Sequence, residues 1–310
     1  MGGIGIVYNP RAGRNNHAPG REETFRRILG DNGVFFRTDD IHALARAVQV
    51  FSKEKVDVIA VGGGDGTLHK VLSAVMHVYQ DSPLPMFAFL RSGTMNTVPN
   101  SIKLKINAAS FLTRIVENYK NNRSFETIAQ HLMRVNDHVG FLTGAGVVAR
   151  FLETYYAAPR PGPVHAAGMV TRMIFSAAFR TGYNRALFKP FPCRMTIDGK
   201  VMAENKYIYV LGCTVRELGL GFTPTPRAYE KPGCFHLLAG NMTPSDLVPK
   251  VPSLWLGKAF SHPRMIYNGI ASRVTIDFHE RTPWMMDGDL YATARRLTLS
   301  VGPTISVIRG

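Results

Sequence analysis

The sequence has few cysteines and no long apolar run, and each absence excludes a class of protein. Cys193, Cys213 and Cys234 are odd in number and lack the spacing of a metal site. We expect them to be reduced thiols of a cytosolic protein. No stretch reaches 18 uninterrupted apolar residues, so no segment is expected to cross a bilayer. The first residues lead directly into an apolar strand, and no signal peptide is expected.

Acidic residues are scarce relative to basic ones. Asp and Glu number 22 against 37 Lys and Arg, which gives a formal net charge of +15. This balance favours polyanionic partners: nucleotide phosphates, nucleic acid or an anionic membrane surface. The basic residues are scattered and no nucleic-acid-binding motif accompanies them, so nucleic acid is not expected. We therefore expect a membrane surface or a nucleotide as the partner. Any membrane contact is expected to be peripheral, at the inner membrane face of a cytoplasmic protein.

The 310 residues are sufficient for two domains. Over residues 1–124, buried-type strands alternate with helices, which predicts a Rossmann-like parallel sheet covered by helices on both faces. Over residues 125–310, polar and apolar residues alternate between Gly, Asn and Pro turns, which predicts a mostly antiparallel β domain. Two helical stretches, 166–180 and 247–260, interrupt the second pattern.

A glycine-rich turn, Gly62–Thr67, separates an apolar strand from a helix. Its backbone N–H groups and the helix dipole form an anion site. Asp65 is unusual there, because a carboxylate repels phosphate unless a cation lies between them or the carboxylate itself handles a proton. This pattern favours a Mg²⁺-nucleotide site. The alternative is an ordinary Asp N-cap in an Asp-Gly turn. The stretch is neither a Walker A loop nor a G-x-G-x-x-G motif.

Three polar turns, 9–14, 62–67 and 91–97, each follow a predicted strand of this sheet. Because ligands bind at the carboxyl ends of parallel strands, we expect the three turns to converge on a nucleotide site.

Near the end of the chain, Asp287-Gly288-Asp289 follows a further strand. Such a tripeptide is often only a turn. With a nucleotide site upstream it becomes a candidate base for an acceptor hydroxyl.

The predicted helix 166–180 is amphipathic, with an apolar stripe that includes Val170, Met173 and Ile174 beside Arg172 and Arg180. Two interpretations stay open: a helix lying in the membrane interface, or a helix packed on a sheet.

Four segments, in order, resemble the diacylglycerol kinase catalytic domain family, which includes soluble bacterial lipid kinases, sphingosine kinases and ceramide kinases. They are Asn9-Pro-x-Ala-Gly13, Gly63-Gly-Asp-Gly-Thr67, Gly93-Thr-x-Asn96 and Asp287-Gly-Asp289. The resemblance implies an α/β domain that binds ATP, a β-sandwich-like domain that holds a lipid, and a cleft between them.

The resemblance also implies roles for individual residues. Asp289, Asp287 and Asp65 would be catalytic, with Asp65 engaging a catalytic Mg²⁺ directly or through water. The implied nucleotide-binding residues are Asn9, Pro10, Arg11, Ala12, Gly13, Thr38, Gly63, Gly64, Asp65, Gly66, Thr67, Leu68, His69, Lys70, Gly93, Thr94 and Asn96.

The sequence departs from the family pattern at several positions. Asp289 replaces the usual Glu of the last motif, and Thr97 and Lys70 replace carboxylates near the phosphates. Pro232 stands where bacterial relatives place a metal-ligating Asp, so their structural Mg²⁺ site is not expected here.

The leading interpretation is an ATP- and Mg²⁺-dependent lipid kinase that phosphorylates a hydroxyl of a diacylglycerol-like or sphingoid lipid at the membrane surface. One alternative is a catalytically degenerate protein that binds lipid or nucleotide, suggested by Thr97, Lys70 and Pro232. Another is a kinase of a soluble substrate such as NAD, because NAD kinases also carry G-G-D-G-T. The sequence leaves the oligomeric state open, with a homodimer as one option.

Overall fold

The computed structural model describes residues 2–80, 82–93, 96–158, 162–178, 182–219, 221–258 and 260–309. The chain forms two compact units. Unit 1 comprises Met1–Gln130 and Pro303–Gly310, and unit 2 comprises His131–Gly302.

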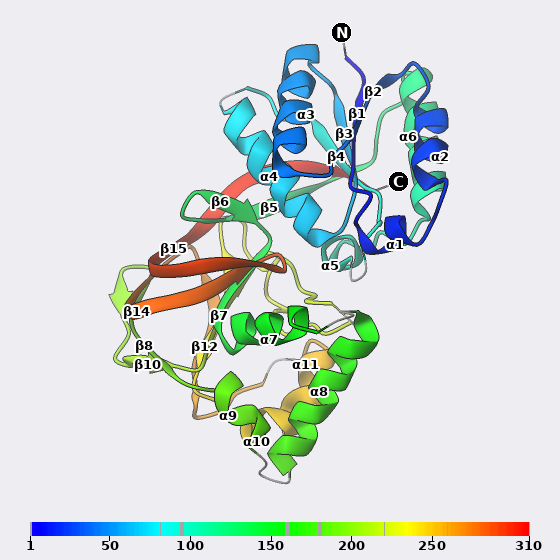
Figure 1. The fold of residues 1–310 in the computed structure, drawn as a ribbon. Helices are drawn as coiled ribbons and strands as arrows, with labels where there is room; N and C mark the ends of the chain where they lie inside the picture. Colours follow the sequence, from blue (N-terminus) through cyan, green and yellow to red (C-terminus); the bar gives the residue numbers. More distant parts are fainter. Residues whose placement is uncertain are drawn as a thin grey trace. The chain divides into compact units, whose positions relative to one another are not determined.

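Unit 1 is built on a parallel sheet. Its strands are β1 (Ile4–Tyr8), β2 (Gly33–Arg37), β3 (Val58–Gly62) and β4 (Met86–Phe89), in the order β2-β1-β3-β4 (Figure 1). Every residue of β1 and β3 is buried, as expected for central strands of a sheet that is covered on both faces. The last part of β15 adds a further parallel strand beside β4, pairing Val307 with Phe87.

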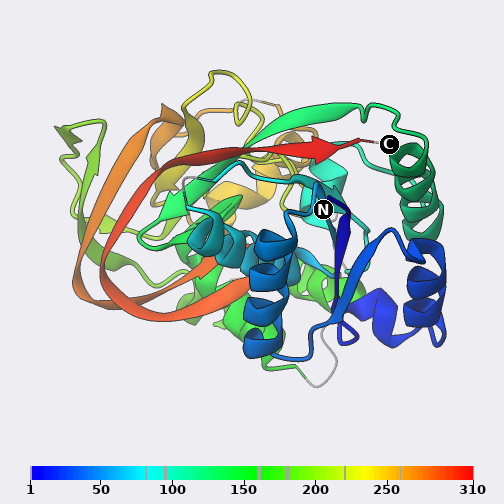
Figure 2. The same ribbon diagram turned by 90° about the horizontal axis from the view of Figure 1, so that it is seen from above.

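Helices cover both faces of this sheet, as Figures 1 and 2 show. One face carries α3 (Ile41–Glu54) and α4 (Asp65–Tyr79), which pack together, and the other carries α2 (Arg21–Leu29) and α6 (Ala108–Lys120). Two short helices, α1 (Gly13–Asn16) and α5 (Thr97–Ser101), follow the strand ends. Side-chain caps set two helix starts: Asp40 accepts from the Ala43 N–H at 2.8 Å, and Asn107 accepts from the Ala109 N–H at 2.9 Å.

Unit 2 is built on antiparallel pairings. The main strand order is β13-β12-β11-β7-β14-β15, with β8 paired to β14, β9 and β10, and β5 paired to β15 and β6. The strands are β5 (Thr127–Val135), β6 (His138–Gly140), β7 (Leu142–Gly146), β8 (Phe191–Ile197), β9 (Lys200–Val201), β10 (Lys206–Tyr207), β11 (Tyr209–Cys213), β12 (Phe235–Gly240), β13 (Met265–Ala271), β14 (Arg273–Met286) and β15 (Asp289–Ile308).

The helices of unit 2 lie in two groups along the chain. The first group is α7 (Val147–Tyr156), α8 (Pro163–Ala178) and α9 (Tyr183–Leu187); the second is α10 (Pro244–Leu247), the 3₁₀ turn η1 (Val248–Lys250) and α11 (Val251–Trp255). Helix α7 packs on β7 and β14, and α8 packs on α7, α9 and α10. No helix within the described residues is both long and apolar enough to span a bilayer.

The predicted fold class, a parallel α/β region followed by a mostly antiparallel β region, is confirmed. The units do not coincide with the predicted ranges 1–124 and 125–310, because the end of the 20-residue strand β15 returns to the sheet of unit 1. The stretch predicted to be helical, 247–260, is helical only as far as Trp255 and is not one continuous helix. Pro249 and Pro252 divide this stretch into η1 and α11, because proline cannot donate the hydrogen bond that would continue the preceding turn.

Candidate functional site

The turn after β1 is joined to the glycine turn after β3 through side chains. The Asn9 Nδ2 donates to the Thr67 hydroxyl at 2.8 Å, and the Asn9 Oδ1 accepts from the Arg11 N–H at 2.9 Å. Asn15, which is 5% exposed, donates to the Asn9 carbonyl at 2.8 Å and to the Gly62 carbonyl at 2.9 Å. Asn15 was not singled out from the sequence, because a single Asn in a polar turn gives no signal of its partners.

The glycine turns after β3 and β4 touch through their backbones. The Ser92 N–H donates to the Gly63 carbonyl at 3.2 Å, and the Arg14 N–H donates to the Ser92 carbonyl at 3.0 Å. A Cβ atom placed on Gly93 would lie 2.5 Å from the Gly64 Cα, so no larger side chain fits. The predicted convergence of the three polar turns at one edge of the sheet is confirmed.

Asp65 joins the glycine turn to α5. Its Oδ2 accepts from the Thr97 N–H at 3.0 Å and its Oδ1 from the Val98 N–H at 3.2 Å. These are the first two N–H groups of α5, which have no acceptor within that helix. Burial raises the pKa of Asp65, and the two backbone donors oppose that rise. Asp65 is therefore the first residue of α4 and at the same time a cap of α5.

The third turn is closed by Asn96, which adopts a left-handed conformation with φ 50°. Its Oδ1 accepts from the Gly93 N–H at 3.0 Å and its Nδ2 donates to the Gly93 carbonyl at 2.8 Å, and the residue is 2% exposed. Asn96 thus holds the shape of the turn. Thr94, which was predicted to complete the nucleotide pocket, lies outside the described residues.

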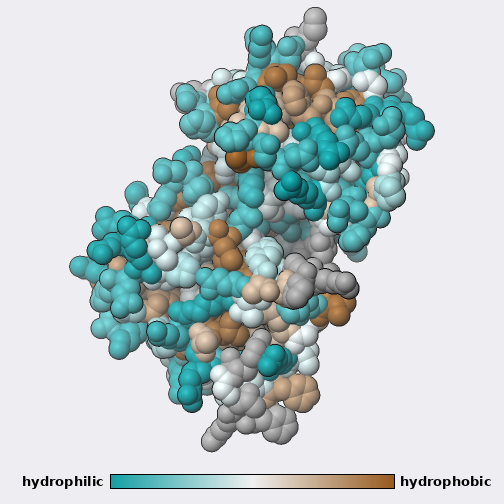
Figure 3. Space-filling model, in the orientation of Figure 1, coloured by the Kyte–Doolittle hydropathy of each residue, from teal (hydrophilic) through white to brown (hydrophobic). Residues whose placement is uncertain are grey.

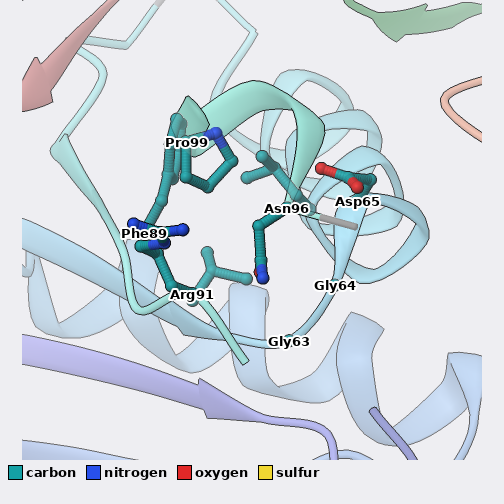
Figure 4. A pocket seen from close by; sticks show the side chains of 9 residues that line it. Gly63, Gly64, Asp65, Phe89, Arg91, Asn96 and Pro99 are labelled. Atoms are coloured by element: carbon teal, nitrogen blue, oxygen red, sulfur yellow. The ribbon is translucent and has the colours of Figure 1, made fainter. Parts of the chain in front are cut away.

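A small pocket lies between the glycine turn and α5 (Figure 4). In this view Asn96 lies between Arg91 and Asp65, beside the backbone of the glycine turn. The Arg91 guanidinium donates to the Leu104 carbonyl at 2.6 Å and to the Asn100 Oδ1 at 2.9 Å, which anchors the segment after α5. The pocket is lined by Val61, Gly63, Gly64, Asp65, Leu68, Phe89, Arg91, Asn96 and Pro99.

Several predicted nucleotide-binding side chains are enclosed by protein. Leu68 is 4% exposed and His69 is 1% exposed, so both belong to the core beneath α4. The Thr38 hydroxyl and N–H both donate to the Tyr8 carbonyl, at 3.2 and 2.8 Å. Lys70 is exposed. In the first turn Arg11 is exposed, Pro10 and Gly13 are half-buried, and Ala12 is buried.

Backbone donors remain at the start of α4. The first turn of this 15-residue helix is Asp65-Gly66-Thr67, whose N–H groups have no acceptors within the helix. The positive end of the helix dipole lies at the same point. This end of the sheet can therefore bind a phosphate through main-chain groups.

The second candidate site is the hairpin turn between β14 and β15 in unit 2. Asp287 has φ 47° and Gly288 has φ 88°, and Met286 pairs with Asp289. Two central residues with positive φ make a type I′ turn, which Asp-Gly favours.

The two carboxylates of this hairpin have different surroundings. Asp287 is 3% exposed; both of its oxygens accept from the Phe141 N–H at 3.0 Å, and Oδ1 accepts from the Leu142 N–H at 2.9 Å. It fixes the corner between β6 and β7. Asp289, at the start of β15, is half-buried as a residue, although its Oδ2 atom is enclosed.

Tyr156, the last residue of α7, supports the hairpin from outside. Its hydroxyl donates to the Gly288 carbonyl at 2.9 Å while half of the residue is exposed. Burial raises the pKa of the nearby Tyr291 phenol, and the charges of Asp289 and Asp287 add to that rise. No sequence pattern points to Tyr156, because its partner is a backbone carbonyl 132 positions away.

The N-terminal part of the chain matches a known family. The model of the diacylglycerol kinase catalytic domain matches residues 4–131, which include all three converging turns. This segment is similar to the diacylglycerol kinase catalytic domain family. It is a family of kinases, and the resemblance predicted from the motifs is confirmed. The hairpin with Asp287 and Asp289 lies beyond the matched residues. No curated protein matches the sequence.

Solved structures extend the likeness of fold to the whole chain. A diacylglycerol kinase from Bacillus anthracis str. Sterne is similar with a TM-score of 0.68 at 16% identity, covering 99% of this chain and 97% of that one. Two further structures from the same organism, also assigned to diacylglycerol kinases, have TM-scores of 0.72 and 0.71 at 16% and 18% identity, with the same coverage. At these identities the likeness shows the fold of the diacylglycerol kinases.

Proposed function

We propose that this chain is an ATP- and Mg²⁺-dependent lipid kinase that phosphorylates a hydroxyl of a diacylglycerol-like or sphingoid lipid at a membrane surface. The observation that supports it most is the convergence of the Asn9, Gly64 and Gly93 turns within a segment similar to the diacylglycerol kinase family. The similarity to a kinase family implies that ATP is the phosphate donor.

The phosphates of ATP would be bound mainly by the backbone. The N–H groups of Asp65, Gly66 and Thr67 at the start of α4 can donate to phosphate oxygens, and glycine allows those oxygens to approach closely. The exposed Arg11 in the neighbouring turn offers a guanidinium for the remaining charge.

The donor set fits a Mg²⁺ ion that arrives with the nucleotide. The Asp65 carboxylate accepts the Thr97 and Val98 N–H groups and also a hydrogen bond from the Thr97 side chain, and its negative charge attracts a cation or the water bound to it. Among the described residues no three His, Cys, Asp or Glu side chains gather as a metal site. One carboxylate and the phosphates suit Mg²⁺, which keeps several waters in kinases. When bound, the ion would neutralise charge that develops on the phosphates.

Asp289 is the proposed general base. The lipid hydroxyl oxygen forms a bond to the γ-phosphorus, the bond from that phosphorus to the bridging oxygen breaks, and ADP leaves. The hydroxyl proton passes to the Asp289 carboxylate. Asp287 is not the proposed general base, because its carboxylate is buried and accepts hydrogen bonds from backbone N–H groups.

Transfer of labelled γ-phosphate tests the proposal. The full chain is incubated with labelled ATP, Mg²⁺ and mixed vesicles that contain diacylglycerol, sphingosine or ceramide, with NAD in a parallel reaction. The proposal predicts label in one of the lipids and none in NAD. Label in NAD alone would favour a kinase of a soluble substrate.

A binding protein without turnover is the second candidate. It is favoured by Lys70, Thr97 and Pro232, which replace carboxylates of the family pattern, and by the capping of α5 by Asp65. Saturable binding of ATP or lipid with no labelled product across the lipid panel would support it. One clear lipid product would exclude it.

A further inference from the structure

In one long stretch of unit 2, all the Asp, Glu, Lys and Arg positions are occupied by Lys or Arg. Residues 154–197 contain no aspartate or glutamate, and they include α8 and α9. Within this stretch itself no carboxylate offsets the positive charges, which favours anionic partners, although Asp246 lies in α10, which packs on α8. Its six basic residues are Arg160, Arg172, Arg180, Arg185, Lys189 and Arg194.

Helix α8 presents apolar side chains to solvent. Ala166, Met169 and Ser176 are buried against the rest of unit 2. On the other face Val164 is 87% exposed and Phe175 is 59% exposed. They stand three turns apart, about 16 Å along the helix axis. The residues between them on this face are exposed as well: Ala167, Gly168, Thr171 and Arg172.

The segment around α11 exposes a second apolar group. Trp255 is 49% exposed and Leu256 is 65% exposed, and the exposed Lys258 follows them. The Thr223 hydroxyl donates to the Trp255 carbonyl at 2.8 Å, and the Phe222 ring meets the Trp255 ring edge-on at 6.4 Å between centroids. These contacts fix the position of the exposed tryptophan.

The two segments belong to one region of unit 2. Helix α10, which leads through η1 into α11, packs on α8. Figure 3 shows apolar surface at both ends of α8. We name this region the docking face and define it by Val164, Arg172, Phe175, Trp255, Leu256 and Lys258.

We propose that the docking face binds an anionic lipid bilayer, with its apolar side chains inserted among the headgroups and its cations at lipid phosphates. Exposed apolar side chains that alternate with Arg and Lys are typical of surfaces that lie in the membrane interface. A second copy of the chain fits less well, because pairing two such faces would bring like charges together. The inference rests on the proposed function, which requires a lipid substrate.

Contacts within unit 2 connect the docking face to the acidic hairpin. The His165 ring of α8 lies 5.9 Å from the Tyr155 ring of α7, and Tyr156 donates to the Gly288 carbonyl. A bilayer on the docking face would therefore lie near the turn that carries Asp289. This arrangement is suited to a substrate that stays in the membrane.

Tryptophan fluorescence tests the docking face in the unmodified full chain. Trp255 is half-exposed and Trp284 is 4% exposed, so bromine on lipid acyl chains can quench only Trp255 after insertion. Vesicles of phosphatidylcholine are compared with vesicles that also contain phosphatidylglycerol, all with brominated acyl chains and without ATP. We expect quenching and a blue shift with the anionic vesicles at about 0.15 M salt, and weaker binding at about 1 M salt. Trp255→Phe should remove the signal.

Substitutions test whether the docking face is the part of the protein that contacts the vesicle. The double variant Val164→Ser with Phe175→Ser should weaken binding to anionic vesicles about tenfold, and Arg172→Gln about fivefold. Matched controls in unit 1, Ile41→Ser (56% exposed) and Arg114→Gln (exposed), should leave binding unchanged.

Two results would overturn the inference. One is equal binding by docking-face variants and controls. The other is absence of quenching together with a dimer, measured by analytical ultracentrifugation, that the docking-face variants dissociate. Failure of the proposed function is distinguishable, because vesicle binding without any phosphorylated lipid contradicts the kinase activity only. Phosphorylation of a short-chain soluble diacylglycerol without vesicle binding contradicts the docking face only.

Discussion

Asp65 and Thr97 are 32 positions apart in the sequence, and a 3.0 Å hydrogen bond from the Thr97 N–H to the Asp65 carboxylate joins them. The same carboxylate accepts from Val98, so the residue at the centre of the glycine turn also caps the helix that follows the third turn. In the family pattern a carboxylate follows the G-T-x-N motif. Here Thr97 contributes its backbone N–H to Asp65.

Substituting Asp65→Asn should therefore affect stability as well as any phosphate transfer. The amide keeps one acceptor oxygen, so one of the two bonds to α5 is lost, and we expect unfolding to become easier by about 1–3 kcal/mol. Urea denaturation followed by circular dichroism measures it. Asp40→Asn, at the exposed cap of α3, is the control and should change stability less. Equal effects of the two substitutions would contradict the capping role.

Gly93→Ala should disrupt the contact between the glycine turns. The new Cβ would lie 2.5 Å from the Gly64 Cα, so the two loops must separate. We expect a loss of stability of about 1–3 kcal/mol and weaker nucleotide binding. The control is Gly168→Ala in α8, where a Cβ meets nothing within 4 Å and alanine favours the helix. Thermal denaturation and ATP titration distinguish them, and an undisturbed Gly93→Ala protein would show that the loops do not need this contact.

The two carboxylates of the β14–β15 hairpin should differ in what they contribute to stability. Asp287→Asn keeps the Oδ1 acceptor but replaces Oδ2 with an NH₂ group that faces the buried Phe141 N–H, and it removes the charge. We expect a cost of about 1–3 kcal/mol. Asp289→Asn, at a half-buried position, should cost far less. Both tryptophans lie in unit 2, so their fluorescence follows its unfolding. Similar losses of stability in the two variants would contradict a structural role for Asp287 that Asp289 does not share.

Mild acid should destabilise unit 2 through His236. Burial lowers its pKa, although the bond between its Nε2 and the Asn268 Oδ1 at 2.8 Å opposes that shift. In the unfolded chain the imidazole takes up a proton near pH 6.5, whereas in the folded chain it does so only at lower pH. Neutral His236 therefore makes its full contribution to the free energy of unfolding above about pH 6.5. This contribution is lost as the pH falls from about 6.5 towards the pKa of His236 in the folded protein.

The midpoint of urea unfolding, followed by tryptophan fluorescence, should therefore fall between about pH 7.5 and 5.5. His236→Gln, which cannot titrate, should flatten this dependence. Arg227 and Glu230 lie near the imidazole, and they keep their charge over this range. An equally steep decline in the variant would assign the effect to other groups.

The sequence predicted the α/β region well because its signals are local. Continuous apolar strands, helices between them and glycine at the strand ends each depend on a few neighbouring residues. The convergence of the turns at Asn9, Gly64 and Gly93 then follows from the parallel sheet, in which all strand ends of one kind meet at one edge.

Other features could not be predicted because their partners are distant in sequence. Asp287 and Asp289 look alike as letters, and only the backbone of Phe141, 146 positions away, makes the first a buried structural group. His69 follows the glycine turn in sequence, but the helical period directs its side chain into the core. The return of β15 to unit 1 depends on pairing between Val307 and Phe87, to which no local pattern points.

The rate of phosphate transfer to lipid by wild type and Asp289→Asn tests the central proposal most directly. With labelled ATP, Mg²⁺ and anionic vesicles that contain the accepted lipid, wild type should give a phosphorylated lipid. Asp289→Asn should be slower by about a hundredfold or more while its unfolding midpoint stays close to that of wild type. No lipid product from wild type, or equal rates for the two proteins, would contradict the account.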